Sequence, residues 1–166
     1  ELYGVATADL EKMLEEDRKR LLAEREKRVK PGRDEKILTA WNGLMISSFV
    51  DGFKVSGNEQ YLKEAKSAAR FILQAMRQDG HLMRVFNRGK CQVKGFSDDY
   101  AFFIQALIDL YEATFEMDWL KEADDLNGRM IRYFWDQVNG GFFFTGDESE
   151  SLIARSKNPY DNATPS

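Results

Sequence analysis

Three aspartates are the residues in this chain whose positions most directly suggest chemistry. Asp98 and Asp99 open a predicted helix, and Asp161 lies near the end of the sequence. Glycoside hydrolysis needs two carboxyl groups flanking the bond to be cleaved, one of them as an acid and the other as a base or nucleophile. Asp98 or Asp99, paired with Asp161, is the pair of catalytic candidates in this sequence. The structural alternatives are a helix N-cap for Asp98 and a turn residue for Asp161.

A second group of polar and aromatic residues surrounds the start of the helix predicted at 37–55. Polar side chains hydrogen-bond sugar hydroxyls, and aromatic rings stack on the C–H faces of sugars, so this group suits a carbohydrate. The alternative for Trp41 is core packing, and the alternative for the whole group is an ordinary polar lead-in to a core helix. The candidates for substrate binding are Arg33, Lys36, Trp41, Asn42 and Tyr100.

His81 and Cys91 are the single histidine and the single cysteine of the chain. They exclude a multi-histidine or thiolate metal site, a CxxC redox pair and an internal disulfide within this sequence. We therefore expect no metal and no cofactor, and we interpret His81 as a surface or hydrogen-bonded residue rather than a catalytic one. The cysteine usage is typical of a reducing compartment, so the expected location is cytoplasmic.

The composition is that of a soluble globular protein, with 43% hydrophobic and 31% charged residues. A net charge of −4 argues against a nucleic-acid partner. We find no apolar run of membrane-spanning length and no signal peptide, so no membrane association is expected. The 166 residues give room for one domain, which we predict to span 1–166.

Hydrophobic spacing divides this domain into helical hairpins and short strands. Helices that are apolar on nearly every side alternate with one-sided helices, and a helix of the first kind must be covered by neighbours. The predicted elements, in order, are a helix at 7–28 capped by Thr7, a helical hairpin at 37–78, strands at 81–94, a second helical hairpin at 98–135, and a strand at 142–145 that opens a tail at 142–166.

The two hairpins form an internal repeat. The sequence Tyr61-Leu62-Lys63-Glu64-Ala65 recurs 58 positions later as Trp119-Leu120-Lys121-Glu122-Ala123. A covered helix followed by a half-exposed helix describes an inner and an outer layer, as in a ring of helical hairpins, an (α/α) toroid. Because the inner helices of such a ring run in one direction, Trp41 and Asp99 are expected at the same end of neighbouring helices.

Several motifs are similar to those of a known family. In chain order they are Arg25-Glu26-Lys27-Arg28-Val29-Lys30-Pro31, Asp34-Glu35-Lys36-Ile37-Leu38-Thr39-Ala40-Trp41-Asn42-Gly43-Leu44-Met45-Ile46, Asp98-Asp99-Tyr100-Ala101, Tyr111-Glu112-Ala113-Thr114, Phe134-Trp135-Asp136, Gly140-Gly141-Phe142-Phe143-Phe144-Thr145 and Asp161-Asn162-Ala163-Thr164-Pro165-Ser166. With these motifs the chain resembles the spermatogenesis-associated protein 20 family and its bacterial YyaL-type relatives over nearly its whole length.

The resemblance implies a fold and a function. The resemblance implies an arrangement in which a thioredoxin-like domain is followed by a six-hairpin, glycosidase-like toroid. That toroid is similar to the one of N-acylglucosamine 2-epimerases. This chain matches part of that toroid, so the implied fold is mainly all-α, a partial (α/α)6 toroid with short β-hairpins between helices. The implied function of the intact protein is carbohydrate binding or processing, as a glycosidase-like or epimerase-like enzyme. The implied partners are a carbohydrate ligand, the remaining toroid hairpins and the thioredoxin-like domain, and the segment alone is expected to be inactive.

Two other functions stay open on the sequence alone. The chain fits a non-catalytic helical scaffold that binds a protein or peptide, or a toroid that regulates a thioredoxin-like domain. An inner helix needs neighbours on both sides, and the helix at 98–115 lacks the next one. We therefore expect exposed apolar surface there and self-association of the chain. The residues expected on that surface are Phe102, Phe103, Ile104 and Tyr111.

Overall fold

The computed structural model describes residues 4, 6–148 and 152–157, and the chain divides into two units, Glu1–Asp34 and Glu35–Ser166. The first unit holds helix α1 (Thr7–Glu26), none of whose side chains is buried. The predicted helix at 7–28 is therefore confirmed, but its N-cap is Ala6, without a side-chain hydrogen bond, and the capping role predicted for Thr7 is wrong. The single domain predicted over 1–166 stays a prediction beside this division.

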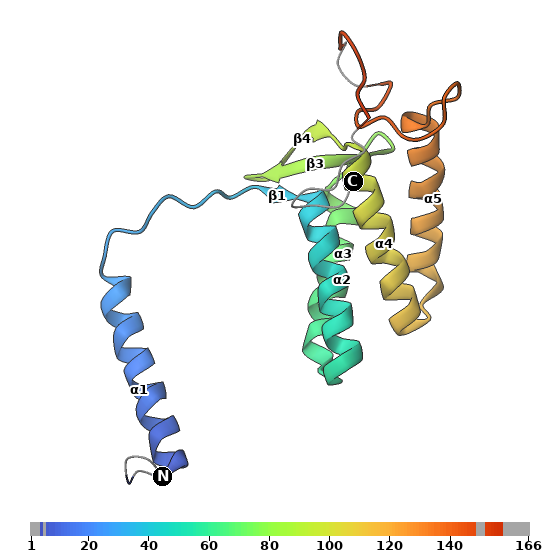
Figure 1. Ribbon diagram of the computed structural model, residues 1–166. Helices are drawn as coiled ribbons and strands as arrows, with labels where there is room; N and C mark the ends of the chain where they lie inside the picture. The colour runs from blue at the N-terminus through green and yellow to red at the C-terminus, as the bar shows by residue number, and fades with distance from the viewer. Residues whose placement is uncertain (1–3, 5, 149–151, 158–166) are drawn as a thin grey trace. The chain divides into compact units, whose positions relative to one another are not determined.

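The second unit contains both predicted hairpins. Its helices are α2 (Thr39–Ser56), α3 (Glu59–Ala75), α4 (Ser97–Thr114) and α5 (Met117–Phe134). Figure 1 shows these four helices side by side, with α2 next to α4, α3 against α2 and α5 against α4. The core lies between them and consists mainly of aliphatic and aromatic side chains, the largest of which are Tyr100, Phe103, Phe134, Ile46 and Ile72.

The repeat of 58 residues is also a repeat of structure. Helices α2 and α4 both have 18 residues, and both bounds of α4 lie 58 positions after those of α2. Even the turn that ends each helix recurs, because Gly57 and Phe115 both adopt the left-handed conformation, with φ angles of 68° and 55°. A glycine adopts this conformation without steric cost, whereas Phe115 is strained there.

Short strands lie at the end of the second unit where α2 and α4 begin (Figure 1). Strand β3 (His81–Asn87) is central and pairs antiparallel with β1 (Ile37–Leu38), β2 (Arg77–Gln78) and β4 (Lys90–Lys94). The predicted strands at 81–94 are thus confirmed. The prediction that the helix begins at residue 37 is wrong, because Ile37–Leu38 pair with β3 and the helix begins at Thr39.

The strand predicted at 142–145 does not form. Gly140 and Gly141, both at positive φ, reverse the chain after α5, and a single bridge then joins Trp135 to Phe142. The next amides find different partners, since Phe143 donates to the carbonyl of Phe134 and Phe144 to that of Ser156. An apolar run whose backbone partners change at every residue cannot build a ladder, so the segment is irregular.

Candidate functional site

Asp99 is a buried carboxylate that joins the starts of the two inner helices. Its Oδ1 accepts a hydrogen bond from the backbone N–H of Ala40, in the first turn of α2, at 2.9 Å. Its Oδ2 accepts from the backbone N–H of Phe96, at the start of α4, at 2.9 Å, and from Nη1 of Arg84 at 2.7 Å. One carboxylate therefore satisfies free N–H groups at two helix starts, where a negative charge is also favoured by the helix dipoles. This geometry confirms that Trp41 and Asp99 lie at the same end of neighbouring helices.

The environment of Asp99 changes its acidity. Its side chain has no exposed surface. Burial, with a smaller contribution from the Asp98 carboxylate, raises the pKa of Asp99 to about 6, against the opposite effect of Phe96 N–H, Arg84 and Ala40 N–H. Both oxygens of Asp99 thus connect the starts of α2 and α4, and its catalytic role stays a prediction.

Asp98 is more accessible than its neighbour. Phe96 is the N-cap of α4, so the N-cap alternative for Asp98 is wrong. The Oδ1 atom of Asp98 accepts from Nη1 of Arg84 at 2.9 Å, and 25% of its side chain is exposed. The guanidinium carbon of Arg84 lies 4.5 Å from the ring centroid of Phe96. A single arginine thus fixes both carboxylates while Asp98 keeps contact with solvent.

Tyr100 belongs to the core. Its hydroxyl accepts from the backbone N–H of Leu82 at 2.9 Å, and its ring packs against Phe134 with centroids 5.3 Å apart. Only 1% of the residue is exposed, and burial raises the pKa of Tyr100. Tyr100 therefore offers no surface to a substrate in this arrangement, and we leave it out of the proposed site together with Asp99.

Trp41 has the opposite environment. It lies in the first turn of α2 and is 64% exposed, and Met45, one turn further along, is 55% exposed. The core alternative for Trp41 is thus wrong. Phe103 departs from its prediction in the other direction, because it was expected at an open surface of α4 and is fully buried. A large exposed indole beside a second exposed apolar side chain is the kind of surface that contacts a ligand or a partner.

Two other predicted binding residues, Asn42 and Lys36, line a groove to which Trp41 does not contribute. The amide of Asn42 donates to the carbonyl of Leu38 at 2.8 Å. Asn42 and Lys36 line a groove of about 410 Å³ whose other wall is α3, through residues such as Phe71. Arg33 belongs to the first unit, and Asp161 lies outside the described residues. Their binding and catalytic roles stay predictions.

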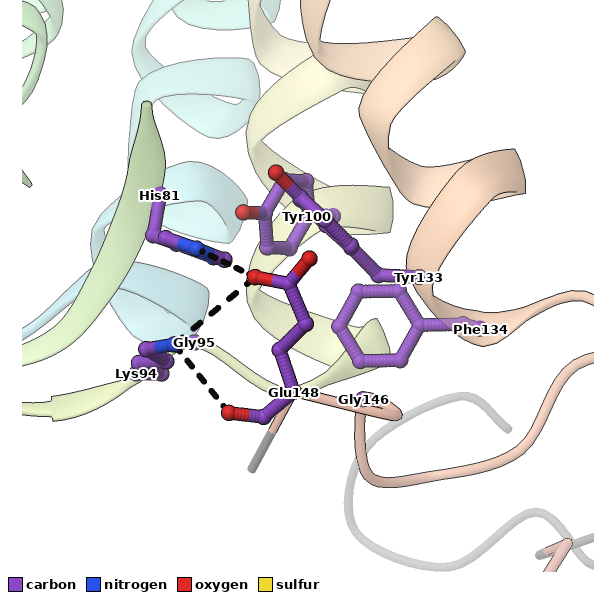
Figure 2. A pocket seen from close by; sticks show the side chains of 8 residues that line it. All are labelled: His81, Lys94, Gly95, Tyr100, Tyr133, Phe134, Gly146 and Glu148. Atoms are coloured by element: carbon purple, nitrogen blue, oxygen red, sulfur yellow. Dashed lines mark hydrogen bonds and ion pairs between the residues drawn. The ribbon is translucent and has the colours of Figure 1, made fainter. Parts of the chain in front are cut away.

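His81 and its surroundings form a small pocket that Figure 2 shows in detail. The imidazole Nε2 lies 3.1 Å from Oε2 of Glu148, and the ring stacks on Tyr133 with centroids 4.7 Å apart. Lys94 donates to the backbone carbonyl of Glu148 at 3.1 Å. The cavity of about 10 Å³ is the size of one water molecule and cannot admit a sugar. The interpretation of His81 as a hydrogen-bonded residue agrees with this geometry.

Arg84 is the residue of the site that the sequence reasoning missed. It lies in the middle of the apolar strand β3, where its charge is a departure from the strand pattern. A charged side chain within a strand of hydrophobic residues is expected to pair with an opposite charge. The Asp98-Asp99 pair at the start of the next helix is the anion that could have been predicted. Among the described residues, no group of three or more His, Cys, Asp or Glu side chains is placed to hold a metal ion. No described helix is long and apolar enough to cross a bilayer.

Comparison with solved structures identifies the fold. The cellobiose 2-epimerase of Spirochaeta thermophila superposes with a TM-score of 0.64 at 20% identity, over 81% of this chain and 35% of the epimerase. The cellobiose 2-epimerase of Bacillus thermoamylovorans gives 0.59 at 13% identity, over 64% and 31%. An α-mannanase of Bacteroides thetaiotaomicron gives 0.57 at 18% identity, over 69% and 32%. The chain therefore has the fold of part of an (α/α)6 toroid, as predicted.

Comparison of sequences gives the relationship. No protein-family model matches the chain. Spermatogenesis-associated protein 20 of Homo sapiens is 34% identical over 99% of this chain, and that of Rattus norvegicus is equally similar. An uncharacterised protein of Caenorhabditis elegans is 31% identical over 98% of the chain. The chain spans only about a fifth of these relatives, 22% of the human protein. It is thus related along nearly its whole length to one segment of the spermatogenesis-associated protein 20 family, the segment that forms part of an (α/α)6 toroid.

Proposed function

We propose that this chain is part of a carbohydrate-binding ring of helical hairpins, and that the intact protein carrying it processes a sugar. The sugar site lies on the rim formed by the starts of the inner helices α2 and α4. The solved toroids of the same fold named above include two cellobiose 2-epimerases and a mannanase, which supports a sugar as the ligand class.

The observation that carries the proposal is the exposed indole of Trp41 at this rim. Trp41 is 64% exposed in the first turn of α2, at the same end of the unit as the partly exposed carboxylate of Asp98. An indole offers a flat apolar face to the C–H groups of a sugar ring, and a carboxylate accepts hydrogen bonds from its hydroxyls. Arg84 holds Asp98 in place through an ion pair, with Nη1 of the arginine 2.9 Å from Oδ1 of the aspartate.

The experiment that tests sugar binding uses the three tryptophans of the chain as separate reporters. Labelling with 5-fluorotryptophan gives one ¹⁹F signal each for Trp41, Trp119 and Trp135. On titration with cellobiose or mannose, we expect the Trp41 signal to shift along a saturable curve. Trp119, which is 5% exposed, is the buried control, and Trp135, which is 38% exposed, controls for unspecific contact with sugar.

The same titration with variants assigns the contacts. Trp41→Ala identifies the signal, and Asp98→Asn is expected to weaken the response of Trp41 at least threefold, because the amide lacks the charge of the carboxylate. A Trp41 signal that does not move up to the solubility limit of the sugar, or that moves linearly together with that of Trp135, contradicts a sugar site at this rim.

Catalysis by Asp98 is a separate part of the proposal. A hydrolase needs a second carboxyl group, and Asp161 is the candidate from the sequence. In a full-length protein that carries this segment, Asp98→Asn is expected to abolish turnover while leaving sugar binding measurable. An Asp98→Asn protein with full activity would limit the role of Asp98 to binding.

A protein-binding scaffold is the second candidate function. It is favoured by Met45, because two adjacent exposed apolar side chains, Trp41 and Met45, suit a protein surface better than a sugar. The ¹⁹F titration separates the two functions, since a scaffold leaves the Trp41 signal unchanged by any sugar.

A further inference from the structure

Arg84 bonds to the described residues through only one of its three side-chain nitrogens. An arginine side chain carries five N–H groups, two on each terminal nitrogen and one on Nε. Those on Nη1 are used, because Nη1 donates to Oδ1 of Asp98 at 2.9 Å and to Oδ2 of Asp99 at 2.7 Å. No described residue accepts a hydrogen bond from Nε or Nη2, and 26% of the side chain is exposed. The edge formed by Nε and Nη2 is therefore open to a ligand.

Asp98 keeps one carboxylate oxygen for a ligand in the same way. Its Oδ1 accepts from Nη1 of Arg84 and from the backbone N–H of Asp99, each at 2.9 Å. Within the described part of the chain nothing donates to its Oδ2, and 25% of the side chain is exposed. The two side chains thus offer donors on Arg84 and an acceptor on Asp98, and their own ion pair joins them.

The surroundings of Arg84 fix these groups before a ligand binds. The guanidinium carbon lies 4.5 Å from the ring centroid of Phe96, and that ring packs on Phe144 with centroids 5.0 Å apart. The backbone N–H of Ser97 also donates to the carbonyl of Phe144 at 3.0 Å, which attaches this segment to the start of α4. Because side chains that are already ordered lose little conformational entropy on binding, the pair is suited to a ligand with a defined arrangement of polar groups.

The charge of this group of side chains decides which ligands it accepts. One guanidinium contacts two carboxylates, Asp98 and Asp99, which leaves one negative charge in excess above the pKa of Asp99, about 6. The start of α4 does not offset this charge, since the N–H groups of Phe96 and Asp99 already bind these carboxylates. An anionic ligand is therefore repelled. An uncharged hydroxyl accepts from Arg84 or donates to Asp98 without this cost.

We propose that Arg84 and Asp98 bind adjacent hydroxyl groups of an uncharged sugar, and that this pair excludes acidic sugars from the rim. One hydroxyl donates to Oδ2 of Asp98, and the oxygen of the neighbouring hydroxyl accepts from the Nε and Nη2 edge of Arg84. The inference rests on the proposed sugar function and deepens it, because it names the class of sugar. It also makes Arg84 a residue that contacts the ligand, in addition to holding Asp98.

Two sugars of the same shape and different charge test the specificity. D-Glucuronate carries a carboxylate where D-glucuronamide carries an uncharged amide. In ¹⁵N-labelled protein, the Nε–H signal of Arg84 and the backbone N–H signal of Asp99 report on binding to the pair. At pH 7 we expect glucuronamide to shift both signals along a saturable curve, and glucuronate to bind about threefold or more weakly. Equal binding of the two sugars, or stronger binding of glucuronate, overturns the proposal.

Two variants separate the donor edge from the charge. Arg84→Lys keeps the positive charge but loses the flat edge of N–H groups. It is expected to bind glucuronamide about threefold or more weakly and to keep the preference over glucuronate. Asp98→Asn removes the excess negative charge, so the preference is expected to fall below about twofold. An Arg84→Lys protein with the affinity of the parent overturns the role of Arg84, and an Asp98→Asn protein with the full preference overturns the stated origin of the specificity.

Arg77→Lys is the matched control. Arg77 also lies in a short strand and pairs with two carboxylates, Glu122 at 2.6 Å and Asp125 at 2.7 Å, and 22% of its side chain is exposed. Unlike Arg84, it uses both terminal nitrogens for these contacts. The variant is expected to bind both sugars like the parent, and a loss as large as that of Arg84→Lys overturns the proposal. The comparison of the two sugars on the parent chain and on Asp98→Asn decides even if Arg84→Lys does not fold.

The ¹⁹F signal of Trp41, followed in the same titrations, distinguishes a failure of this inference from a failure of the proposed function. If the Trp41 signal shifts along a saturable curve while the signals of Arg84 and Asp99 stay constant, the sugar function stands and the role of Arg84 is overturned. If none of these signals responds to mannose, cellobiose or glucuronamide, both are overturned.

Discussion

Helices α2 and α4 are the same element placed in two environments. They have equal lengths and equivalent bounds, yet the position occupied by Trp41 in α2 is exposed and the equivalent Asp99 in α4 is buried. The difference comes from what lies next to each helix within the chain. A helix with an apolar pattern on nearly every side is expected to be covered by neighbours. The tertiary contacts of the described residues decide which side of each helix is covered in this structure.

The largest effect on stability is expected from substituting Asp99, the buried member of this pair of equivalent positions. Asp99→Ala removes the acceptor from two backbone N–H groups and one partner from Arg84. We expect the free energy of unfolding to fall by about 3 kcal/mol or more at pH 7. Urea unfolding followed by circular dichroism measures it. The control is Asp98→Ala, whose carboxylate is partly exposed and makes one side-chain ion pair, and which should cost about 1 kcal/mol or less. Equal losses for the two would contradict the joint role of Asp99.

The same carboxylate predicts a pH dependence that α2 lacks at its equivalent position. The pKa of Asp99 is about 6 in the folded protein against an ordinary value of 3.8. Between these values the folded state holds a proton that the unfolded state has released, so stability falls as the pH rises through this window and levels off above it. At about 1.4 kcal/mol per pKa unit, the shift corresponds to roughly 3 kcal/mol. The stability difference between the parent and Asp99→Ala should therefore shrink from pH 4 to pH 6. A difference that grows with pH would mean that Arg84 lowers the pKa below its ordinary value.

Much of the architecture follows from the sequence, because it depends on local patterns. The repeat of Tyr61-Leu62 in Trp119-Leu120 identifies two equivalent hairpins, and the turn residues place the helix ends within a few positions. The start of α2 is predicted two residues too early. Ile37–Leu38 have an apolar pattern compatible with a helix, and that pattern does not reveal their pairing with strand β3 further along the chain.

The candidate site is less predictable than the fold, because it depends on contacts between distant residues. Asp99 has the sequence position of a catalytic carboxylate, and its structural role depends on Ala40, 59 positions earlier, and on Arg84. Trp41 has the position of a core residue, and it is exposed because no described element of the second unit covers it. Sequence patterns place Trp41 and Asp99 at the same end of neighbouring helices, and the contacts between α2 and α4 decide which residues there remain accessible.

The close contact between α2 and α4 can be tested through Gly43. Gly43→Ala adds a methyl group that would lie 2.7 Å from the backbone of Phe102, so we expect a loss of about 1–3 kcal/mol although alanine is the better helix former. The equivalent residue of α4, Ala101, is partly exposed and is already an alanine. The matched control is Gly128→Ala in α5, which has open space and should gain up to about 1 kcal/mol. A stabilising Gly43→Ala would show that α2 and α4 are further apart than the close backbone contact implies.

Substitutions in the turns that end α2 and α4 are expected to change the free energy of unfolding by about 1 kcal/mol. Phe115 adopts the left-handed conformation that Gly57 adopts at the equivalent position, and its side chain is 77% exposed. Phe115→Gly should raise the free energy of unfolding by about 1 kcal/mol, because the strain is relieved and little packing is lost. Gly57→Ala should lower it by a similar amount. Thermal or urea unfolding of both variants measures the effect, and a destabilised Phe115→Gly would mean that the ring contact with Tyr111 outweighs the strain.

The smallest effect on stability is expected at Trp41, the exposed member of the equivalent pair Trp41 and Asp99. Most of its side chain is in solvent within one chain, so Trp41→Ala should change the free energy of unfolding of the monomer by no more than about 0.5–1 kcal/mol. Urea unfolding followed by circular dichroism measures the change, and Asp99→Ala at the equivalent position of α4 is the buried counterpart. A large cost of Trp41→Ala would mean that the indole is covered within the chain, and the contrast with Asp99 would then be one of chemistry rather than of neighbours.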